Sequence, residues 1–142
     1  MDFKRILINW TWVNSPVSQT ALRLYECSKI FPGVKIGVMS DSYNCMNGQS
    51  ADLASGDLGT PVTVLKEEPG CESGSDEGRA MAQIIADVAP DATMSYYTAF
   101  DGQADFANGI RALANAGADV IVDDVGYFAE PYFQDGLISQ AI

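Results

Sequence analysis

Short apolar runs alternate with stretches of helical spacing along most of the chain. Four runs rich in β-branched or aromatic residues are bounded by glycine, proline or polar residues, which predicts strands. They cover residues 34–40, 62–66, 92–100 and 118–124. The first of them, VKIGVMS, precedes the polar stretch DSYNCMNGQS, which we expect to form a loop. Asp41 should therefore stand at the carboxyl end of a buried strand.

A helix is predicted after the second strand, in the segment GSDEGRAMAQIIADVAPDA. Its apolar residues recur at helical spacing and should face the core, namely Met81, Ile84, Ile85 and Val88. Ser75 is placed to cap the start of this helix, and Pro90 prevents its continuation. Asp76 and Glu77 lie in or beside its first turn, where the helix dipole favours acidic side chains whether or not they have a further role.

Two more helices are predicted towards the C-terminus. The first begins after Asp101 as its cap and ends at Gly117 in the left-handed conformation. Its apolar face consists of Phe106, Ile110 and Leu113. The second begins in the final stretch, PYFQDGLISQAI, at residues 131–142.

Strands that alternate with helices through short loops imply right-handed βαβ crossovers and a parallel sheet. The predicted fold class is therefore α/β, with three layers: a mostly parallel sheet and helices on both of its faces. At 142 residues the chain fits a single domain, 1–142. Residues 1–32 form an N-terminal extension with a candidate strand at 5–13 and a candidate helix at 18–31.

Charge and hydropathy narrow the range of partners. Eight basic residues face nineteen acidic ones, and the net charge of −11 repels nucleic acids and anionic lipid surfaces. No apolar run approaches the ~20 residues needed to cross a bilayer. We therefore expect neither nucleic acid nor a membrane as a partner.

Cys45 and Cys71 both lie in loops rich in glycine, asparagine and serine, and Cys27 is the third cysteine. A disulfide between Cys45 and Cys71 would close a loop of about 25 residues and contribute ~3 kcal/mol in an oxidising compartment. This pairing is our prediction, and three reduced thiols are the alternative. The disulfide favours a secreted or extracytoplasmic location.

The chemistry open to this chain is mainly that of carboxylates. The sequence contains no histidine, which excludes Ser-His-Asp and Cys-His catalysis and imidazole-based zinc sites. The usual nucleophile-elbow, phosphate-loop and dinucleotide-binding patterns do not occur either. Because sites in open parallel sheets form at the carboxyl ends of strands, five acids should gather at one edge. They are Asp41, Glu77, Asp101, Asp123 and Asp124.

Three motifs in this order resemble the first half of a subtilisin-like serine peptidase domain. They are VKIGVMSDSYN, DEGRAMAQIIADVAPDA and ALANAGADVIVDDVGYF. In that family a strand ends in the aspartate of the catalytic triad, and Asp41 holds this place. A His-Gly-Thr motif then opens a helix that ends in a Val-Ala-Pro-x-Ala turn, and here Glu77 stands in the place of the histidine. The resemblance covers residues 33–142 and implies a partial subtilisin-like fold with Asp41 and Glu77 as catalytic residues.

The chain departs from the family pattern in three places. Glu77 in place of histidine is similar to the sedolisin branch, whose Ser-Glu-Asp triad works in acid, but the aspartate expected four residues later is Met81 here. Asp123 and Asp124 replace an Asn-x-Ser pattern, so we assign no oxyanion role to them. The Gly-Thr-Ser motif that carries the family's nucleophile does not occur in this sequence.

The resemblance implies a truncated or isolated part of a serine endopeptidase domain, a hydrolase that acts on peptides or proteins once a serine-bearing segment completes it. This chain alone should be inactive, because its acids cannot form an acyl intermediate. No cofactor is expected, and calcium binding stays open with no residues assigned. The alternative is a non-catalytic secreted α/β binding or assembly module. A phosphoacceptor receiver domain is disfavoured, since only Lys66 lies near a strand end.

A subtilisin-like sheet that stops after its middle strand would leave an apolar edge. Such an edge predicts a homodimer or a complementary fragment as partner. The aromatic residues expected at that surface are Tyr127, Phe128, Tyr132 and Phe133. Ordinary packing of these rings under the final helix is the other interpretation.

Overall fold

The computed structural model describes residues 6–9 and 33–142 of the chain. The predicted helix at 18–31 and Cys27 lie outside these residues. The elements are β1 (Ile6–Asn9), β2 (Lys35–Ser40), α2 (Gln49–Ser55), β3 (Thr63–Lys66), the 3-10 turn η1 (Pro69–Cys71), α3 (Glu77–Val88), β4 (Thr93–Thr98), α4 (Gln103–Asn115), β5 (Val120–Asp123) and the 3-10 turn η2 (Ser139–Ala141).

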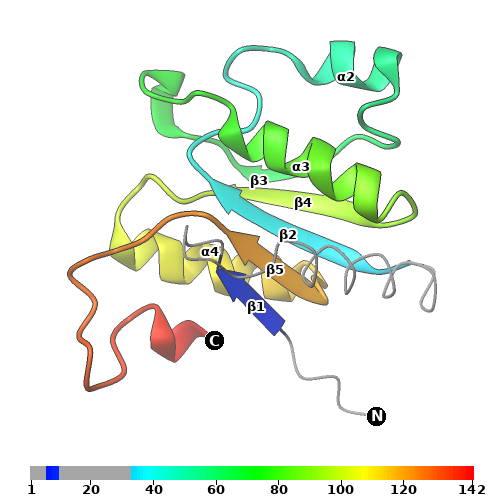
Figure 1. The fold of residues 1–142 in the computed structure, drawn as a ribbon. Helices are drawn as coiled ribbons and strands as arrows, with labels where there is room; N and C mark the ends of the chain where they lie inside the picture. Colours follow the sequence, from blue (N-terminus) through cyan, green and yellow to red (C-terminus); the bar gives the residue numbers. More distant parts are fainter. Residues whose placement is uncertain (1–5, 10–32) are drawn as a thin grey trace.

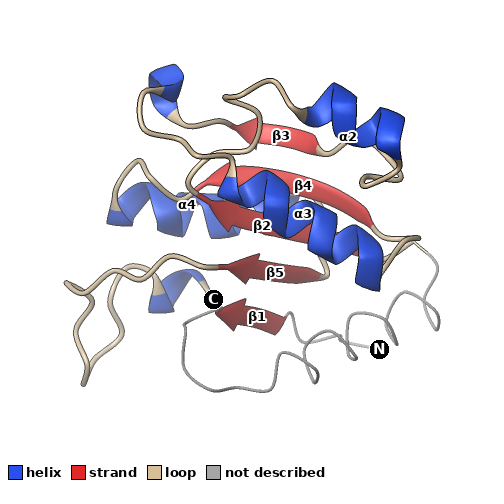
Figure 2. Cartoon of the chain, turned by 45° about the horizontal axis from the view of Figure 1, so that its top comes forward, coloured by secondary structure: helices blue, strands red, loops and turns tan. Residues whose placement is uncertain are grey.

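The strands form one parallel sheet in the order β1-β5-β2-β4-β3. β2 lies at its centre, between β5 and β4, and the strands run in the same direction in Figure 2. All their carboxyl ends therefore meet at one edge of the sheet. Helices α3 and α4 lie on opposite faces (Figure 1), which confirms the predicted three-layer α/β class.

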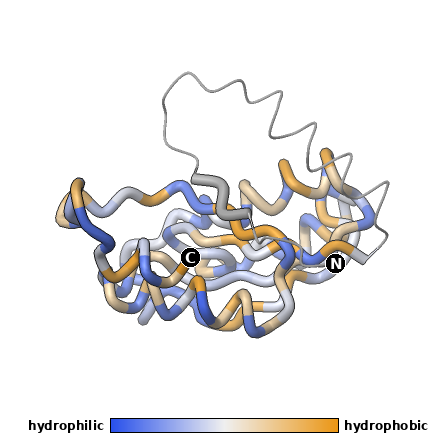
Figure 3. The backbone as a smooth tube through the Cα atoms, turned by 90° about the horizontal axis from the view of Figure 1, so that it is seen from below, coloured by the Kyte–Doolittle hydropathy of each residue, from blue (hydrophilic) through white to orange (hydrophobic). Residues whose placement is uncertain are grey.

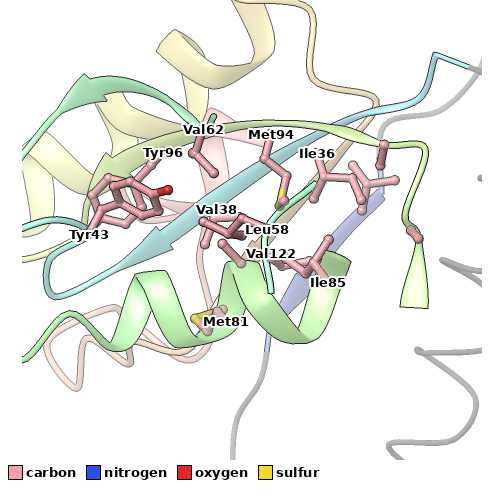
Figure 4. Packing of buried hydrophobic residues seen from close by; sticks show 14 of the residues in the cluster. Ile36, Val38, Tyr43, Leu58, Val62, Met81, Ile85, Met94, Tyr96 and Val122 are labelled. Atoms are coloured by element: carbon pink, nitrogen blue, oxygen red, sulfur yellow. The ribbon is translucent and has the colours of Figure 1, made fainter. Parts of the chain in front are cut away.

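Each face of the sheet has its own apolar core. The core under α3 contains side chains of three strands and of the helix (Figure 4), among them Ile36, Val38, Met81, Ile85, Met94, Tyr96 and Val122. The core under α4 includes Met39, Phe106, Ile110, Leu113 and Ile121. Neighbouring residues of a strand point to opposite faces, so Val38 and Met39 belong to different cores. Burial on both faces explains why residues 36–39 of β2 and 120–122 of β5 are apolar without alternation.

The four predicted strands are confirmed as β2, β3, β4 and β5, each shorter than its prediction. Helix α2 was not predicted, because its sequence QSADLAS offers only Leu53 as a larger apolar residue and so shows no helical period. The predicted helix at 131–142 is wrong, since only η2 forms there. Pro131 and Gly136 interrupt the segment, and the Glu130 carboxylate accepts the N–H of Ile138 at 2.9 Å.

The buried face of α3 differs from the prediction at one position. Met81 and Ile85 are buried as expected, but the side chain of Ile84 is 49% exposed. The helix contacts the sheet through Gly78 and Ala82, which allow its backbone to come close. This close approach turns the contact face away from Ile84.

Replacing Gly78 with alanine is expected to destabilise the protein by about 2–3 kcal/mol. A Cβ atom there would lie 2.5 Å from Cε2 of Tyr96 and 2.7 Å from the backbone oxygen of Ser42. Helix propensity alone predicts the opposite sign, a gain of about 0.5–1 kcal/mol. Urea unfolding measures the difference, with Gly126→Ala as the control, because a Cβ at Gly126 meets open space. A stabilised Gly78→Ala variant would contradict the close packing of α3.

The sheet edge beyond β5 is occupied by β1, which pairs with β5 in parallel from Ile6↔Val120 to Asn9↔Asp123. Within the described residues, the edge strands of the sheet are therefore β1 and β3. Tyr127 packs edge-on against Phe106 of α4, with ring centroids 5.4 Å apart. The other three predicted aromatics lie on the surface, and their exposed fractions are 96% for Phe128, 88% for Tyr132 and 102% for Phe133.

Hydrophobic and hydrophilic positions are interleaved along the backbone (Figure 3). In the described part of the chain, no helix has the length and apolar character that a bilayer crossing requires. The buried apolar residues form the two cores on either side of the sheet.

Candidate functional site

Asp41 directly follows β2, and its side chain binds the backbone at the start of α3. Its carboxylate is 4% exposed. Atom Oδ2 accepts hydrogen bonds from the backbone N–H and the hydroxyl of Ser75, the latter at 2.6 Å. Atom Oδ1 accepts the N–H of Ser42 and, at 3.0 Å, the N–H of Glu77. A side chain distant in sequence thus binds N–H groups that the start of a helix leaves without internal partners.

These hydrogen bonds keep Asp41 ionised. Burial raises the pKa of Asp41, but the bonds from the Ser75 hydroxyl and from three backbone N–H groups outweigh it, and the pKa lies below its usual value. The prediction that Ser75 caps α3 is wrong, because its hydroxyl donates to Asp41 and the residue at the N-cap is Asp76. Asp41 performs the capping because the end of β2 meets the start of α3 in space.

Asp76, the first acid of the pair, supports the loop after β2. It is 3% exposed and has a left-handed backbone, with φ of 58°. Its Oδ1 accepts the hydroxyl of Ser42 at 3.0 Å and the N–H of Cys45 at 2.8 Å. Its Oδ2 accepts the N–H of Met46 at 3.1 Å and Nε of Arg79 at 3.2 Å. The carboxylate of Asp76 is therefore engaged by hydrogen-bond donors of the fold itself.

Glu67 holds the same loop from the other side. Its two carboxylate oxygens accept the N–H groups of Tyr43 and Asn44 at 2.9 and 2.8 Å. Arg79 in addition donates Nη1 to Asp52 of α2 at 2.7 Å. Loop 41–48 is thus fixed by carboxylates from several elements, which gives the edge of the sheet a defined shape.

Glu77, the second acid of the pair, is exposed at the same edge as Asp41. Asp124, just beyond β5, accepts the hydroxyl of Ser40 on Oδ2 at 3.0 Å. Its Oδ1 is buried and accepts no hydrogen bond from the described residues. The pKa of Asp124 is raised to about 6. Burial is the main cause, the charges of Glu77 and Asp41 also raise the pKa, and the Ser40 hydrogen bond lowers it.

Asp123, the last residue of β5, is 1% exposed and pairs in register with Met39 of β2. Burial raises its pKa to about 7, while the N–H of Val125 lowers it and the charge of Asp124 raises it. The edge therefore combines two acids that bind protons in mild acid with Asp41, which stays ionised.

Asp101 also lies beyond the carboxyl end of a strand, β4, but its carboxylate is engaged by a cation. It forms an ion pair with Lys66 at 2.5 Å, and Lys66 also contacts Asp105 at 2.9 Å. The N-cap of α4 is Gly102, so the prediction that Asp101 caps this helix is wrong. The hydrogen bonds that Lys66 donates to Asp101 and Asp105 raise the pKa of Lys66.

The predicted disulfide between Cys45 and Cys71 is confirmed, with Cα atoms 5.2 Å apart. It joins loop 41–48 to η1 and so adds a covalent link to the hydrogen bonds of Asp76 and Glu67. Closing a loop of this length stabilises a fold by about 3 kcal/mol.

The edge contains Asp41, Glu77, Asp123 and Asp124, as the sequence predicted. Sequence reasoning missed Ser40, Ser42 and Glu67, because their roles depend on partners remote in the chain and no local spacing signals them. No protein-family model, curated protein or solved structure compared with the chain matches it. Fold and side-chain geometry are therefore the basis for assigning a function.

Proposed function

We propose that the chain is the acid-base part of a subtilisin-like serine peptidase domain of the type that uses glutamate in place of histidine. The observation that carries this proposal is the contact between Asp41 and the start of α3. The Asp41 carboxylate accepts the N–H of Glu77 at 3.0 Å, so two residues 36 positions apart meet at the rim of a parallel sheet. A catalytic pair of aspartate and glutamate requires their side chains to meet, and this backbone hydrogen bond supports the proposal by bringing the residue that carries the Glu77 side chain to Asp41.

Within this proposal the acids have separate roles. Glu77, exposed at the start of α3, accepts the proton of an incoming serine hydroxyl. Asp41 positions Glu77 by binding its N–H, and the low pKa of Asp41 prevents it from sharing that proton. Asp124, whose pKa is raised to about 6 by burial and by the charges of Glu77 and Asp41, holds a proton in the site in mild acid. These features support an acidic optimum.

A serine from outside residues 1–142 completes the site, because the acids alone cannot form a covalent acyl intermediate. The chain by itself should then show no peptidase activity. A peptide or protein is the substrate of the completed site.

The test is peptide hydrolysis by the full-length source protein, measured between about pH 3 and pH 8. Replacing Glu77 with glutamine should lower kcat by about 10²–10⁴-fold, the usual effect of losing a general base. Glu72→Gln is the matched control, since Glu72 is a nearby exposed acid with the same charge. If Glu77→Gln retains full activity at every pH, the catalytic proposal is wrong.

The second candidate is a non-catalytic binding or assembly module. The exposed rings of Phe128, Tyr132 and Phe133 in the segment after β5 favour it, because exposed aromatic groups are common at protein interfaces. This candidate predicts a dimer in light scattering that Glu77→Gln leaves unchanged and that serine at the three aromatic positions abolishes. A monomeric wild-type chain at all concentrations would contradict it.

A further inference from the structure

Glu68 carries a buried carboxylate oxygen that accepts no hydrogen bond within residues 6–9 and 33–142. The side chain is 9% exposed, and its Oε1 accepts the hydroxyl of Ser73 at 3.2 Å. Its Oε2 is buried and receives no hydrogen bond from the described residues. Leaving a buried carboxylate oxygen without a partner costs free energy, so this atom suggests a ligand.

The Glu68 carboxylate lies beside the two cysteine sulfurs. A carboxylate oxygen of Glu68 and the Sγ atoms of Cys45 and Cys71 all lie within 4.8 Å of one another. In a tetrahedral zinc site the bond lengths place the ligand atoms roughly 3.5–4 Å apart. The three groups therefore need only small movements to surround one ion, apart from the bond that now joins the two sulfurs.

The backbone around both cysteines is held independently of the disulfide. The N–H of Cys45 donates to Oδ1 of Asp76 at 2.8 Å. The N–H of Cys71 donates to the backbone oxygen of Glu68 at 3.2 Å. Both thiols should therefore stay close to Glu68 after the disulfide is reduced.

We propose that Cys45, Cys71 and Glu68 form a binding site for a thiophilic divalent cation such as Zn²⁺ when the disulfide is reduced. A dithiol reductant supplies two electrons and two protons, becomes a disulfide itself and leaves two thiols on the protein. Zn²⁺ then displaces both thiol protons and binds two thiolates and the Glu68 carboxylate. The fourth position is taken by water. In the oxidised protein the sulfurs are bonded to each other and the site does not form.

The test is a Zn²⁺ titration of the oxidised and reduced chain, using a competing chromophoric chelator. A phosphine serves as reductant, because dithiols bind zinc themselves, and Cys27→Ser removes the remaining thiol from both samples. The reduced protein should bind one Zn²⁺ and the oxidised protein none. Co²⁺ in place of Zn²⁺ should give the intense absorption of cobalt–thiolate bonds only after reduction.

Two variants distinguish a folded three-ligand site from Zn²⁺ binding by the two thiolates alone. Glu68→Gln should weaken Zn²⁺ binding by at least about tenfold, since even residues that only support a ligand usually have that effect. Glu72→Gln, its exposed neighbour with the same change of charge, should leave the affinity within about twofold. Equal Zn²⁺ affinity in Glu68→Gln and wild type would overturn the proposal, and so would equal binding by the oxidised and reduced protein. A reduced chain that circular dichroism shows to be unfolded would also overturn it, because Glu68 could not then contribute.

Discussion

Replacing Asp41 with alanine is expected to lower the free energy of unfolding by about 3–5 kcal/mol at neutral pH. The carboxylate accepts hydrogen bonds from three backbone N–H groups and the hydroxyl of Ser75. Without it, three N–H groups lose their acceptor, that of Ser42 at a buried position and those of Ser75 and Glu77 at partly buried ones. Donors that are shielded from water then bear a desolvation penalty. Urea unfolding of the variant and the wild type measures this loss.

Asp119→Ala is the control for the Asp41 experiment. Asp119 also accepts one backbone N–H, that of Lys35 at 2.9 Å, but at an exposed position. Its loss should cost no more than about 1 kcal/mol. Similar destabilisation in the two variants would mean that Asp41 does not hold the start of α3 as the structure indicates.

Folding stability is expected to fall as the pH rises from about 4.5 to about 7.5, because of Asp123 and Asp124. Burial raises their folded-state pKa values to about 7 and about 6, above the usual value of 3.8. In this range the folded protein binds more protons than the unfolded chain, so raising the pH favours unfolding. Asp123 alone should contribute on the order of 4 kcal/mol across this range.

Asp41 makes folding stability rise with pH, but it does so only below this pH range. Its pKa is lowered on folding, so its contribution is present above pH 3.8 and is lost only in stronger acid. Unfolding by urea at several pH values measures how the free energy of unfolding changes with pH. Asp123→Asn combined with Asp124→Asn should flatten this dependence. Asp87→Asn with Asp91→Asn makes the same change of net charge at exposed positions and should leave the dependence intact. If both double variants showed the same dependence of unfolding free energy on pH, Asp123 and Asp124 would not be its cause.

Much of the fold could be predicted because its signals are local. The strand runs at residues 34–40 and 118–124 are apolar on both faces, which only burial within a sheet explains. The apolar faces of α3 and α4 follow helical spacing. The missed α2 and the wrong final helix lie where local signals are weak, since the first has one larger apolar residue and the second contains Pro131 and Gly136.

The candidate site was predicted only in outline. Strand ends placed Asp41, Asp123 and Asp124 at one edge, because parallel strands share their direction. The same reasoning included Asp101, which the structure pairs with Lys66 instead. Which acid is structural and which is available depends on neighbours that sequence spacing does not reveal. Asp76 and Glu77 are adjacent, yet the first is 3% exposed and fully engaged while the second is exposed.

By itself the sequence determined four strands and the two longer helices α3 and α4, the apolar faces that build two cores, and the set of acids that can reach one edge. These follow from periodicity and turn residues, which act over a few positions of the chain. Only the tertiary structure decided that Asp41 caps α3, that Asp76 supports a loop, that β1 covers β5 and that Glu68 faces a disulfide. The physical reason is that hydrogen bonding and desolvation depend on distance in space, and these partners lie far apart along the chain.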